Sequence, residues 1–135
     1  MANPNIVNVT SIYGNTAYVI PSSSATATTS WTYNGTTTLT GLTPASGTVN
    51  RVTAIVAANT TASAVNATIA IGNNATFGSA TVITYPAYQI SVPANASLII
   101  IDKTNSVYIT ESQSVAAYSA TGNALTFTAT FEAIS

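Results

Sequence analysis

The sequence of 135 residues contains no cysteine and no histidine, and these absences exclude most familiar catalytic centres. Histidine is the most frequent general base and metal ligand, and cysteine supplies thiol nucleophiles and many zinc ligands. Three acidic residues are present, but a lone acidic residue in a turn is usually a cap or a solvated charge (Asp102, Glu111 and Glu132). The sequence therefore predicts a protein that is not an enzyme and that has no catalytic, metal-binding or cofactor-binding site.

Charge is also scarce, and this scarcity limits the partners that the protein can bind. Charged residues make up 4% of the chain, and two basic against three acidic residues give a formal net charge of -1. Two basic residues cannot neutralise a row of phosphates, so nucleic acid is not an expected partner. A surface of hydroxyl and amide groups with little net charge favours association with other proteins.

Long apolar runs are missing as well. The densest run, Leu98–Ile101, is far shorter than the roughly 20 residues that a membrane-spanning helix needs. The first residues lack the basic and apolar regions of a secretory signal. The sequence thus predicts neither a membrane partner nor a secretory signal.

Short apolar runs separated by turn residues are abundant. Hydrophobic residues make up 47% of the chain, and the runs show no helical period. Leu98–Ile101, a polar break at 102–105 and Val107–Ile109 indicate strand, turn and strand. Asn50–Ala58 is apolar on both faces and predicts a central strand. Further strands are expected at 16–20, 31–33, 36–40, 64–71, 80–84, 87–92, 114–119 and 125–132.

Roughly eight to ten short strands in a chain of this length predict one all-β domain, an antiparallel β-sandwich over residues 1–135. A jelly roll is one form of such a sandwich. An immunoglobulin-like Greek key is the alternative, although the cysteine pair of that fold is missing. Tyr85-Pro86 separates two of the expected strands and, because proline removes a backbone donor, predicts a sheet edge or corner.

The N-terminal segment 1–14 is a candidate extended arm, with an N-terminal strand as the alternative. Ile6, Val9 and Ile12 are its apolar anchors, and Gly14-Asn15 predicts a turn after it.

Residues 31–47 are expected to project from the body of the domain as a hairpin and loop. Asn34-Gly35 is a strong hairpin signal, and the segment begins with the single tryptophan, Trp31. Before it, 22–30 is a Ser/Ala/Thr-rich tract that predicts either a flexible loop or a flat strand of poorly specified register.

Several motifs near the two ends of the chain carry a resemblance to known proteins. They are the opening Met1–Gly14, Val92-Pro93, Ser97–Lys103 leading to Val107–Ile109, the acidic turn Glu111–Ser114 and the closing Glu132–Ser135. This succession resembles a family of small virion structural proteins from tailed phages of marine cyanobacteria and similar hosts. The acidic turn is Glu-Ser-Gln-Ser, where the family pattern is nearer Glu-Gly-Asp. The match is good at both ends and poor over 22–46.

The resemblance implies that the protein belongs to a virion. We expect a capsid decoration, or cement, protein on the outer surface of the head, which binds between major capsid protein subunits and stabilises the assembled lattice by mass action. A homo-oligomer is expected, and a trimer would suit a three-fold site. A tail, neck or fibre-associated subunit is the alternative within the virion. A carbohydrate-binding module, with stacking aromatic residues drawn from Trp31, Tyr33, Tyr85 and Tyr88, is the alternative from another class.

Candidate interface residues come from the arm, the hairpin and the few charged positions. Tryptophan and tyrosine are enriched at interface hot spots. Asp102-Lys103 together with Arg51 could form ion pairs between subunits, with a solvated turn as the alternative. The full set is Ile6, Val9, Ile12, Tyr13, Trp31, Tyr33, Arg51, Asp102 and Lys103.

Overall fold

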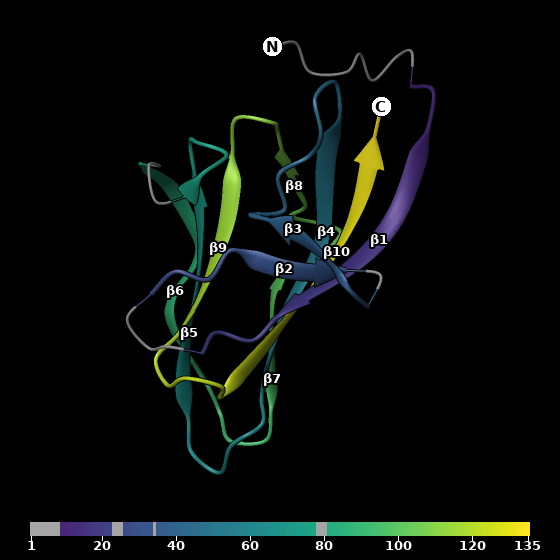
Figure 1. Cartoon of the computed structure of the whole chain (residues 1–135). Helices are drawn as coiled ribbons and strands as arrows, with labels where there is room; N and C mark the ends of the chain where they lie inside the picture. Colours follow the sequence, from purple (N-terminus) through teal and green to yellow (C-terminus); the bar gives the residue numbers. More distant parts are fainter. Residues whose placement is uncertain (1–8, 23–25, 34, 78–80) are drawn as a thin grey trace.

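The short apolar runs form strands in the computed structural model, which describes residues 9–22, 26–33, 35–77 and 81–135 (Figure 1). The described residues form ten strands, and all of their pairings are antiparallel. They include no helix with the length and hydrophobicity needed to cross a membrane. The strands are β1 (Ile12–Val19), β2 (Ser30–Tyr33), β3 (Thr37–Thr40), β4 (Val49–Asn59), β5 (Val65–Gly72), β6 (Val82–Val92), β7 (Ser97–Ile101), β8 (Val107–Ile109), β9 (Ser114–Ser119) and β10 (Leu125–Ile134).

The strands form two sheets that pack as a sandwich (Figure 1). The large sheet has the order β3-β2-β1-β10-β4-β7, and β8 also pairs with β4. The small sheet has the order β6-β5-β9. The expected all-β antiparallel sandwich is therefore confirmed.

Strand pairs are nested along the chain, so that the first strand pairs with the last. β1 pairs with β10 in the large sheet, and the next segment forms a bridge from Thr28 to Ala117 of β9 in the small sheet. Further inward, β4 pairs with β7 and β8 in the large sheet, and β5 pairs with β6 in the small one. Successive nested pairs thus alternate between the sheets, as they do when an antiparallel ribbon wraps into a jelly roll. The jelly-roll form, and not the immunoglobulin-like alternative, agrees with this order.

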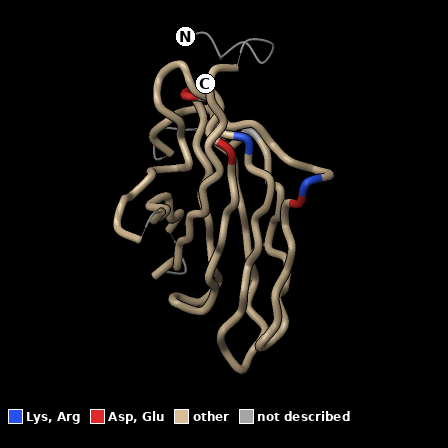
Figure 2. The backbone as a smooth tube through the Cα atoms, turned by 90° about the vertical axis from the view of Figure 1, so that its right-hand side faces the viewer, with Lys and Arg blue, Asp and Glu red and all other residues tan. Residues whose placement is uncertain are grey.

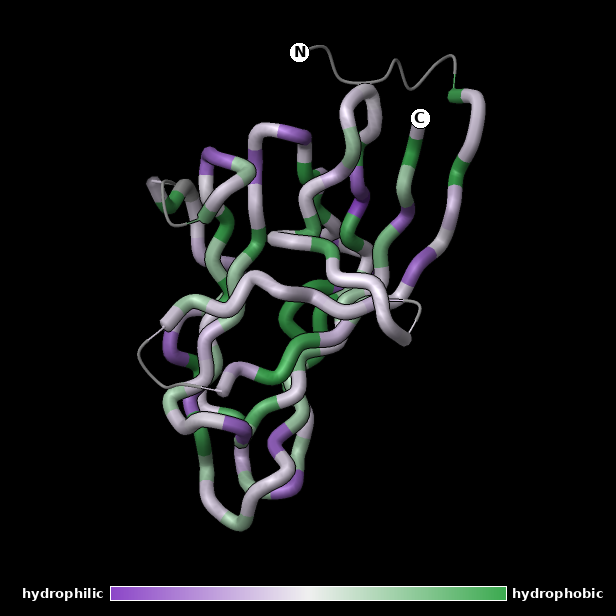
Figure 3. The backbone as a smooth tube through the Cα atoms, viewed as in Figure 1, coloured by the Kyte–Doolittle hydropathy of each residue, from purple (hydrophilic) through white to green (hydrophobic). Residues whose placement is uncertain are grey.

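Apolar side chains at alternate strand positions fill the interior. In β10, Phe127 and Ala129 are buried, whereas Thr128 and Thr130 between and beyond them are exposed, which is the period of two of a sheet with one face toward the core. Several hydrophilic segments lie in turns at the two ends of the sandwich, and others lie within strands such as β1 (Figure 3). The largest fully buried side chains include Trp31, Leu42, Ile55, Ile69, Ile101, Ile109, Leu125 and Phe127.

The predicted arm is wrong for residues 12–14, which belong to the large sheet. Ile12 pairs with Ile134, and β1 continues without a break through Gly14-Asn15, where the sequence predicts a turn. The length of β10 explains the difference, because each residue from Ile12 to Val19 finds a partner along it. Just before β1, the backbone N–H of Thr10 donates to the Ser135 carbonyl oxygen at 2.7 Å. The rest of the expected arm, 1–8, lies outside the described residues.

The hairpin of β2 and β3 is confirmed, but its expected projection from the body is wrong. Both strands run across the front of the sandwich in Figure 1. Trp31 is fully buried, and so is Leu42 just after the hairpin. Backbone bonds of 2.7 Å, from Gly41 N–H to Thr29 O and from Val115 N–H to Gly41 O, fasten its base to β9. Burial of these large apolar side chains holds the segment against the core. Of the preceding tract, 23–25 lies outside the described residues.

The region around Pro86 is one irregular strand rather than two. β6 is continuous from Val82 to Val92 and lies at the edge of the small sheet, so the predicted edge position is confirmed and the predicted separation is wrong. The central position of β4, between β10 on one side and β7 and β8 on the other, is also confirmed. β7 and β8 pair with successive parts of β4, so the turn at 102–105 joins two pieces of one sheet edge.

Candidate functional site

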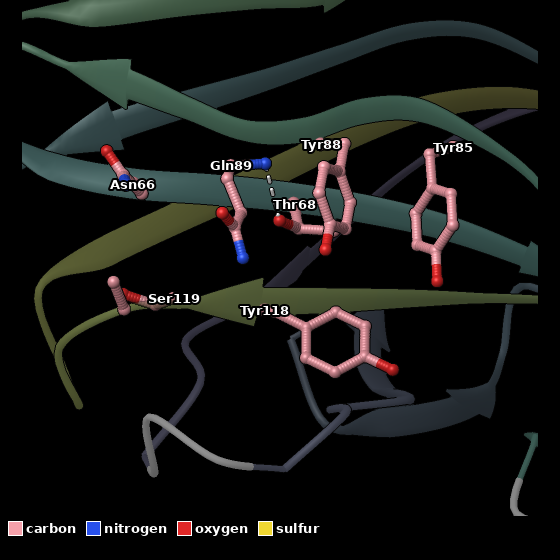
Figure 4. Close-up of a pocket in the computed structure, with 8 residues that line it drawn as sticks. Asn66, Thr68, Tyr85, Tyr88, Gln89, Tyr118 and Ser119 are labelled. Carbon is pink, nitrogen blue, oxygen red and sulfur yellow. Dashed lines mark hydrogen bonds between the residues drawn. The ribbon is translucent and has the colours of Figure 1, made fainter.

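A pocket of about 370 Å³ lies on the outer face of the small sheet, away from the core (Figure 4). All three strands of that sheet contribute to it. Thr68 of β5 stands directly opposite Tyr118 of β9 across the strand pair, and β6 supplies two further tyrosines. The lining residues are Asn66, Thr68, Tyr85, Tyr88, Gln89, Tyr118, Ser119 and Ala120.

Two irregularities in β6 bring Tyr85 and Tyr88 to the same face. Residues three positions apart point to opposite faces of a regular strand. The register of β6 against β5 shifts on both sides of Ala87, which pairs with Ile69 and stays buried. On each side, three steps along β6 match two steps along β5, as in a β-bulge. Each extra residue shifts the alternation by one position, so both tyrosines point outward.

The second bulge is stabilised by Thr68. Gln89 adopts a positive φ of 50°, which a residue with a side chain seldom adopts. Its backbone N–H donates to the Thr68 hydroxyl at 2.9 Å. Thr68 is buried, so this bond gives its hydroxyl group a partner in the floor of the pocket. The bond fixes the backbone of Gln89, whose side chain lines the pocket (Figure 4).

The tyrosine rings form the walls of the pocket. Tyr85 and Tyr88 pack edge to face, with ring centroids 4.9 Å apart and an interplanar angle of 65°. They remain 45% and 57% exposed, and their hydroxyl groups point across β5 toward β9 (Figure 4). Tyr118 packs edge to face on Phe77, with ring centroids 6.5 Å apart. Burial, and in second place the neighbouring Tyr85, raise the pKa of Tyr118, so its hydroxyl keeps its proton at neutral pH.

Charged side chains are absent from the lining of this pocket. The charged residues lie toward the end of the sandwich that carries the two chain ends, and the opposite end shows none (Figure 2). Among the described residues, no three acidic, cysteine or histidine side chains come together as they would around a metal ion. The pocket therefore offers aromatic faces, amides and hydroxyl groups as its binding chemistry.

The outer face of the large sheet is a second candidate surface. Its register aligns Tyr18, Thr128, Val56 and Ile99 in one row across β1, β10, β4 and β7. Tyr18 is 44% exposed and Ile99 is 65% exposed. We call these four residues the outer row. No described strand packs over them, so they are available to another molecule.

The aromatic interface candidates of the hairpin do not belong to either surface. Trp31 is fully buried and donates its indole N–H to the Val115 carbonyl oxygen, so its assignment to an interface is wrong. Tyr33 is half-buried and packs edge to face on Phe131, with centroids 6.5 Å apart. Both residues were candidates because tryptophan and tyrosine are frequent at interfaces, yet this core uses the tryptophan as its largest side chain.

The apolar candidates near the N-terminus fall into two groups. Ile12 and Tyr13 are 59% and 68% exposed at the start of β1 and remain available for a contact. Val9 is half-buried. Ile6 lies outside the described residues. The structure thus exposes two apolar side chains near the end of the predicted arm 1–14, in residues that belong to β1.

The charged candidates are separated in the fold. Arg51 lies opposite Glu132 in the large sheet, with 3.5 Å between Nη1 and Oε2, and also donates to the Ser106 hydroxyl at 3.3 Å. Asp102 accepts two hydrogen bonds from Thr104 within its own turn, and Lys103 beside it is exposed. Within the chain, the cross-strand register places Glu132 beside Arg51. The ion pairs of Arg51, Asp102 and Lys103 between subunits stay a prediction.

Sequence reasoning included Tyr85 and Tyr88 among the aromatic candidates but missed the rest of the pocket. Asn66, Gln89 and Tyr118 gave no local signal, because their proximity depends on the pairing of three strands. Pro86 between the tyrosines was the available clue, since a proline in a strand often marks a bulge.

Comparisons with protein-family models, curated proteins and solved structures find no match to this chain. The two surfaces must be interpreted from their own chemistry.

Proposed function

We propose that this chain is a non-enzymatic virion structural protein that decorates the outside of a phage head by binding between capsid subunits. The resemblance of both ends of the chain to phage structural proteins supports membership of a virion. The low charge of the whole sequence supports a protein whose partners are other proteins.

The observation that carries the proposal is the outer row on the large sheet. Tyr18 and Ile99 are exposed large side chains, and Val56 between them is half-buried without a covering strand. Thr128 within the row and Thr130 further along β10 are exposed and add hydroxyl groups. Exposed apolar side chains beside polar groups are the usual composition of a protein contact surface. The rigid sandwich supplies this surface without a conformational change.

A second contact is assigned to the start of β1. Ile12 and Tyr13 are exposed there, and residues 1–8 precede them. In the proposed mechanism, the outer row rests on one capsid subunit while the N-terminal segment reaches a neighbouring one. A group that binds the assembled lattice and not its free subunits stabilises the lattice by mass action. Three copies around a three-fold axis would satisfy the closed symmetry that homo-oligomers prefer.

Electron microscopy of intact virions with gold-labelled antibody tests the location. Label spread over the head agrees with decoration. Label confined to the tail or neck would overturn it and favour the tail, neck or fibre subunit, which is the second candidate because the same exposed row could serve that assembly. Failure to label intact particles, with the protein present in disrupted ones, would also exclude the outer surface.

A reconstitution experiment tests the surface. Ile99→Asp replaces the most exposed member of the outer row with a charge, and the edge position of β7 should tolerate it. We expect binding to heads that lack the protein to weaken at least about tenfold, since each tenfold is about 1.4 kcal/mol. Tyr88→Ala, on the other sheet, is the matched control and should bind normally.

Deletion of residues 1–8 tests the second contact. The deletion must stop before Val9, because Thr10 and β1 are hydrogen-bonded to the rest of the fold. We expect the shortened protein to unfold at the same urea concentration as the full chain but to bind heads more weakly. Unchanged binding would show that the segment is not an arm.

A further inference from the structure

We infer that the pocket on the small sheet, walled by Tyr85, Tyr88 and Tyr118, binds a short neutral saccharide. This inference goes beyond the proposed structural role and does not depend on it. It would give the decorated particle, or the isolated protein, an affinity for glycans.

The pocket is built at a conformational cost. A non-glycine residue at positive φ, such as Gln89, costs about 1 kcal/mol or more relative to ordinary backbone. The two bulges interrupt the pairing of β6 with β5 and leave Tyr85 and Tyr88 largely exposed. A regular strand would avoid the positive φ and would keep the pairing intact. Bulges and strained residues of this kind recur at binding sites, where they direct a side chain toward a ligand.

The lining of the pocket combines aromatic faces with amide and hydroxyl groups. Tyrosine rings offer flat apolar faces on which the C–H side of a sugar ring can lie, and their hydroxyl groups can bond to sugar hydroxyls. Asn66 and Gln89 each carry a carbonyl acceptor and an NH₂ donor, and both side chains are exposed at the pocket. Hydroxyl groups on a sugar need this mixture of donors and acceptors. A neutral saccharide can use both features.

The lining of the pocket cannot neutralise an ionised ligand. No charged side chain lines the pocket, so a phosphate, sulfate or carboxylate group would lose its hydration without gaining a counter-charge. The lining therefore disfavours an anionic ligand. The pocket volume of about 370 Å³ is at the lower end of the range for small-molecule sites, about 300–1,000 Å³, which limits the bound part to a short saccharide.

The geometry defines the binding mode. The hydroxyl groups of Tyr85 and Tyr88 point across β5 toward β9, where Tyr118 forms the opposite wall (Figure 4). A sugar ring placed between these walls would have Gln89 and Asn66 along one end. The bond from the Gln89 backbone N–H to the Thr68 hydroxyl at 2.9 Å fixes the backbone at that end before the ligand arrives. Such preorganisation lowers the entropy that binding must overcome.

The test is ligand titration of the full chain followed by NMR. The probes are neutral disaccharides built from glucose, galactose, mannose and N-acetylglucosamine, together with a sulfated disaccharide. We expect at least one neutral probe to bind with saturable shifts at Tyr85, Tyr88 and Tyr118, and the sulfated probe to bind more weakly. If none of the neutral probes gives saturable shifts at these tyrosines, or if the sulfated probe is preferred, the inference is wrong.

Two variants locate the binding. Tyr88→Ala removes one wall and should weaken binding about tenfold or more. Tyr108→Ala removes a tyrosine of similar exposure, 48%, on β8 of the other sheet and should leave the affinity unchanged. Should Tyr88→Ala lower the unfolding midpoint, Gln89→Asn keeps a residue that tolerates positive φ while shortening the amide, and it should also weaken binding. Equal affinity in Tyr88→Ala and Tyr108→Ala would place the ligand elsewhere and overturn the inference.

Saccharide binding and attachment to phage heads can be tested independently, because they use different surfaces. The Tyr88→Ala protein should still bind phage heads. The Ile99→Asp protein should bind heads weakly but bind the saccharide with the affinity of the parent. A protein that binds saccharide but never attaches to heads would retain this inference and reject the decoration role.

Discussion

The indole N–H of Trp31 donates a hydrogen bond to the carbonyl oxygen of Val115, with 3.1 Å between the two atoms. Trp31 lies in β2 of the large sheet and Val115 in β9 of the small sheet, so the bond connects the two layers. Both residues are buried. The hairpin that carries the tryptophan is thereby part of the core, and its aromatic side chain contributes to stability rather than to a surface.

Substitution of Trp31 should therefore affect folding. Trp31→Phe leaves the buried Val115 carbonyl without its donor and should lower the free energy of unfolding by about 1–3 kcal/mol. Trp31→Ala adds a large cavity and should cost about 3–5 kcal/mol. Urea unfolding at equilibrium measures both, with Tyr108→Ala as the exposed control expected within about 0.5 kcal/mol of the parent. A Trp31→Phe protein as stable as the parent would contradict the assigned role of this bond.

Gly41 should not tolerate a side chain. An added Cβ would lie 2.6 Å from the Cβ of Ser114, and the φ of Gly41 is +64°. We expect Gly41→Ala to lower the free energy of unfolding by about 2–4 kcal/mol, which combines the overlap with the backbone strain.

Two other glycines separate the causes of that loss. Gly35 has a φ of +79° with nothing within 4 Å of its added Cβ. Gly35→Ala should therefore lower the free energy of unfolding through backbone strain alone, by about 1 kcal/mol. Gly14 has the same free space, and Gly14→Ala should be neutral or slightly stabilising. If Gly41→Ala and Gly35→Ala lose the same stability, the close approach to Ser114 is not significant.

The turn at 102–105 should respond to acid through Asp102. The Thr104 hydroxyl, followed by the Thr104 backbone N–H, holds the pKa of this carboxyl below its ordinary value. Because the folded-state pKa is the lower one, the contribution is fully present above the unfolded-state pKa and is lost as pH falls through the folded-state pKa. Thr104→Val should raise the pKa of Asp102, and Thr104→Ser should keep it low. Carboxyl titration by NMR distinguishes them, and equal values in both variants would exclude the hydroxyl as the main cause.

Thr68 should control the shape of the bulge at Gln89. Thr68→Val keeps the volume but leaves the Gln89 N–H without its acceptor at 2.9 Å, so we expect a loss of about 1–3 kcal/mol. Thr128→Val, on the exposed outer face of β10, is the matched control and should change stability by less than about 0.5 kcal/mol. The coupling constant that reports the φ of Gln89 should change in the Thr68 variant alone. An unchanged φ with unchanged stability would show that the bulge does not depend on this bond.

Local features of the sequence were sufficient to predict the all-β class and most of the strands. Asn34-Gly35 marked the hairpin, and the run Asn50–Ala58, apolar on both faces, marked the central strand β4. These predictions succeed because alternation, β-branched residues and turn residues act over a few neighbouring positions. The scarcity of charge in the whole chain likewise needs no coordinates.

Tertiary structure decided which side chains reach the surface and which of them meet. Trp31 became core because β9 lies beneath the hairpin, and Arg51 found Glu132 because of the register between β4 and β10. Gly14-Asn15 stayed in a strand because β10 offered partners on that side. The tyrosine pocket exists because two bulges in β6 place Tyr85 and Tyr88 on the same face, whereas regular alternation would place them on opposite faces. In each case the cause is pairing between segments far apart in the chain, which no local pattern contains.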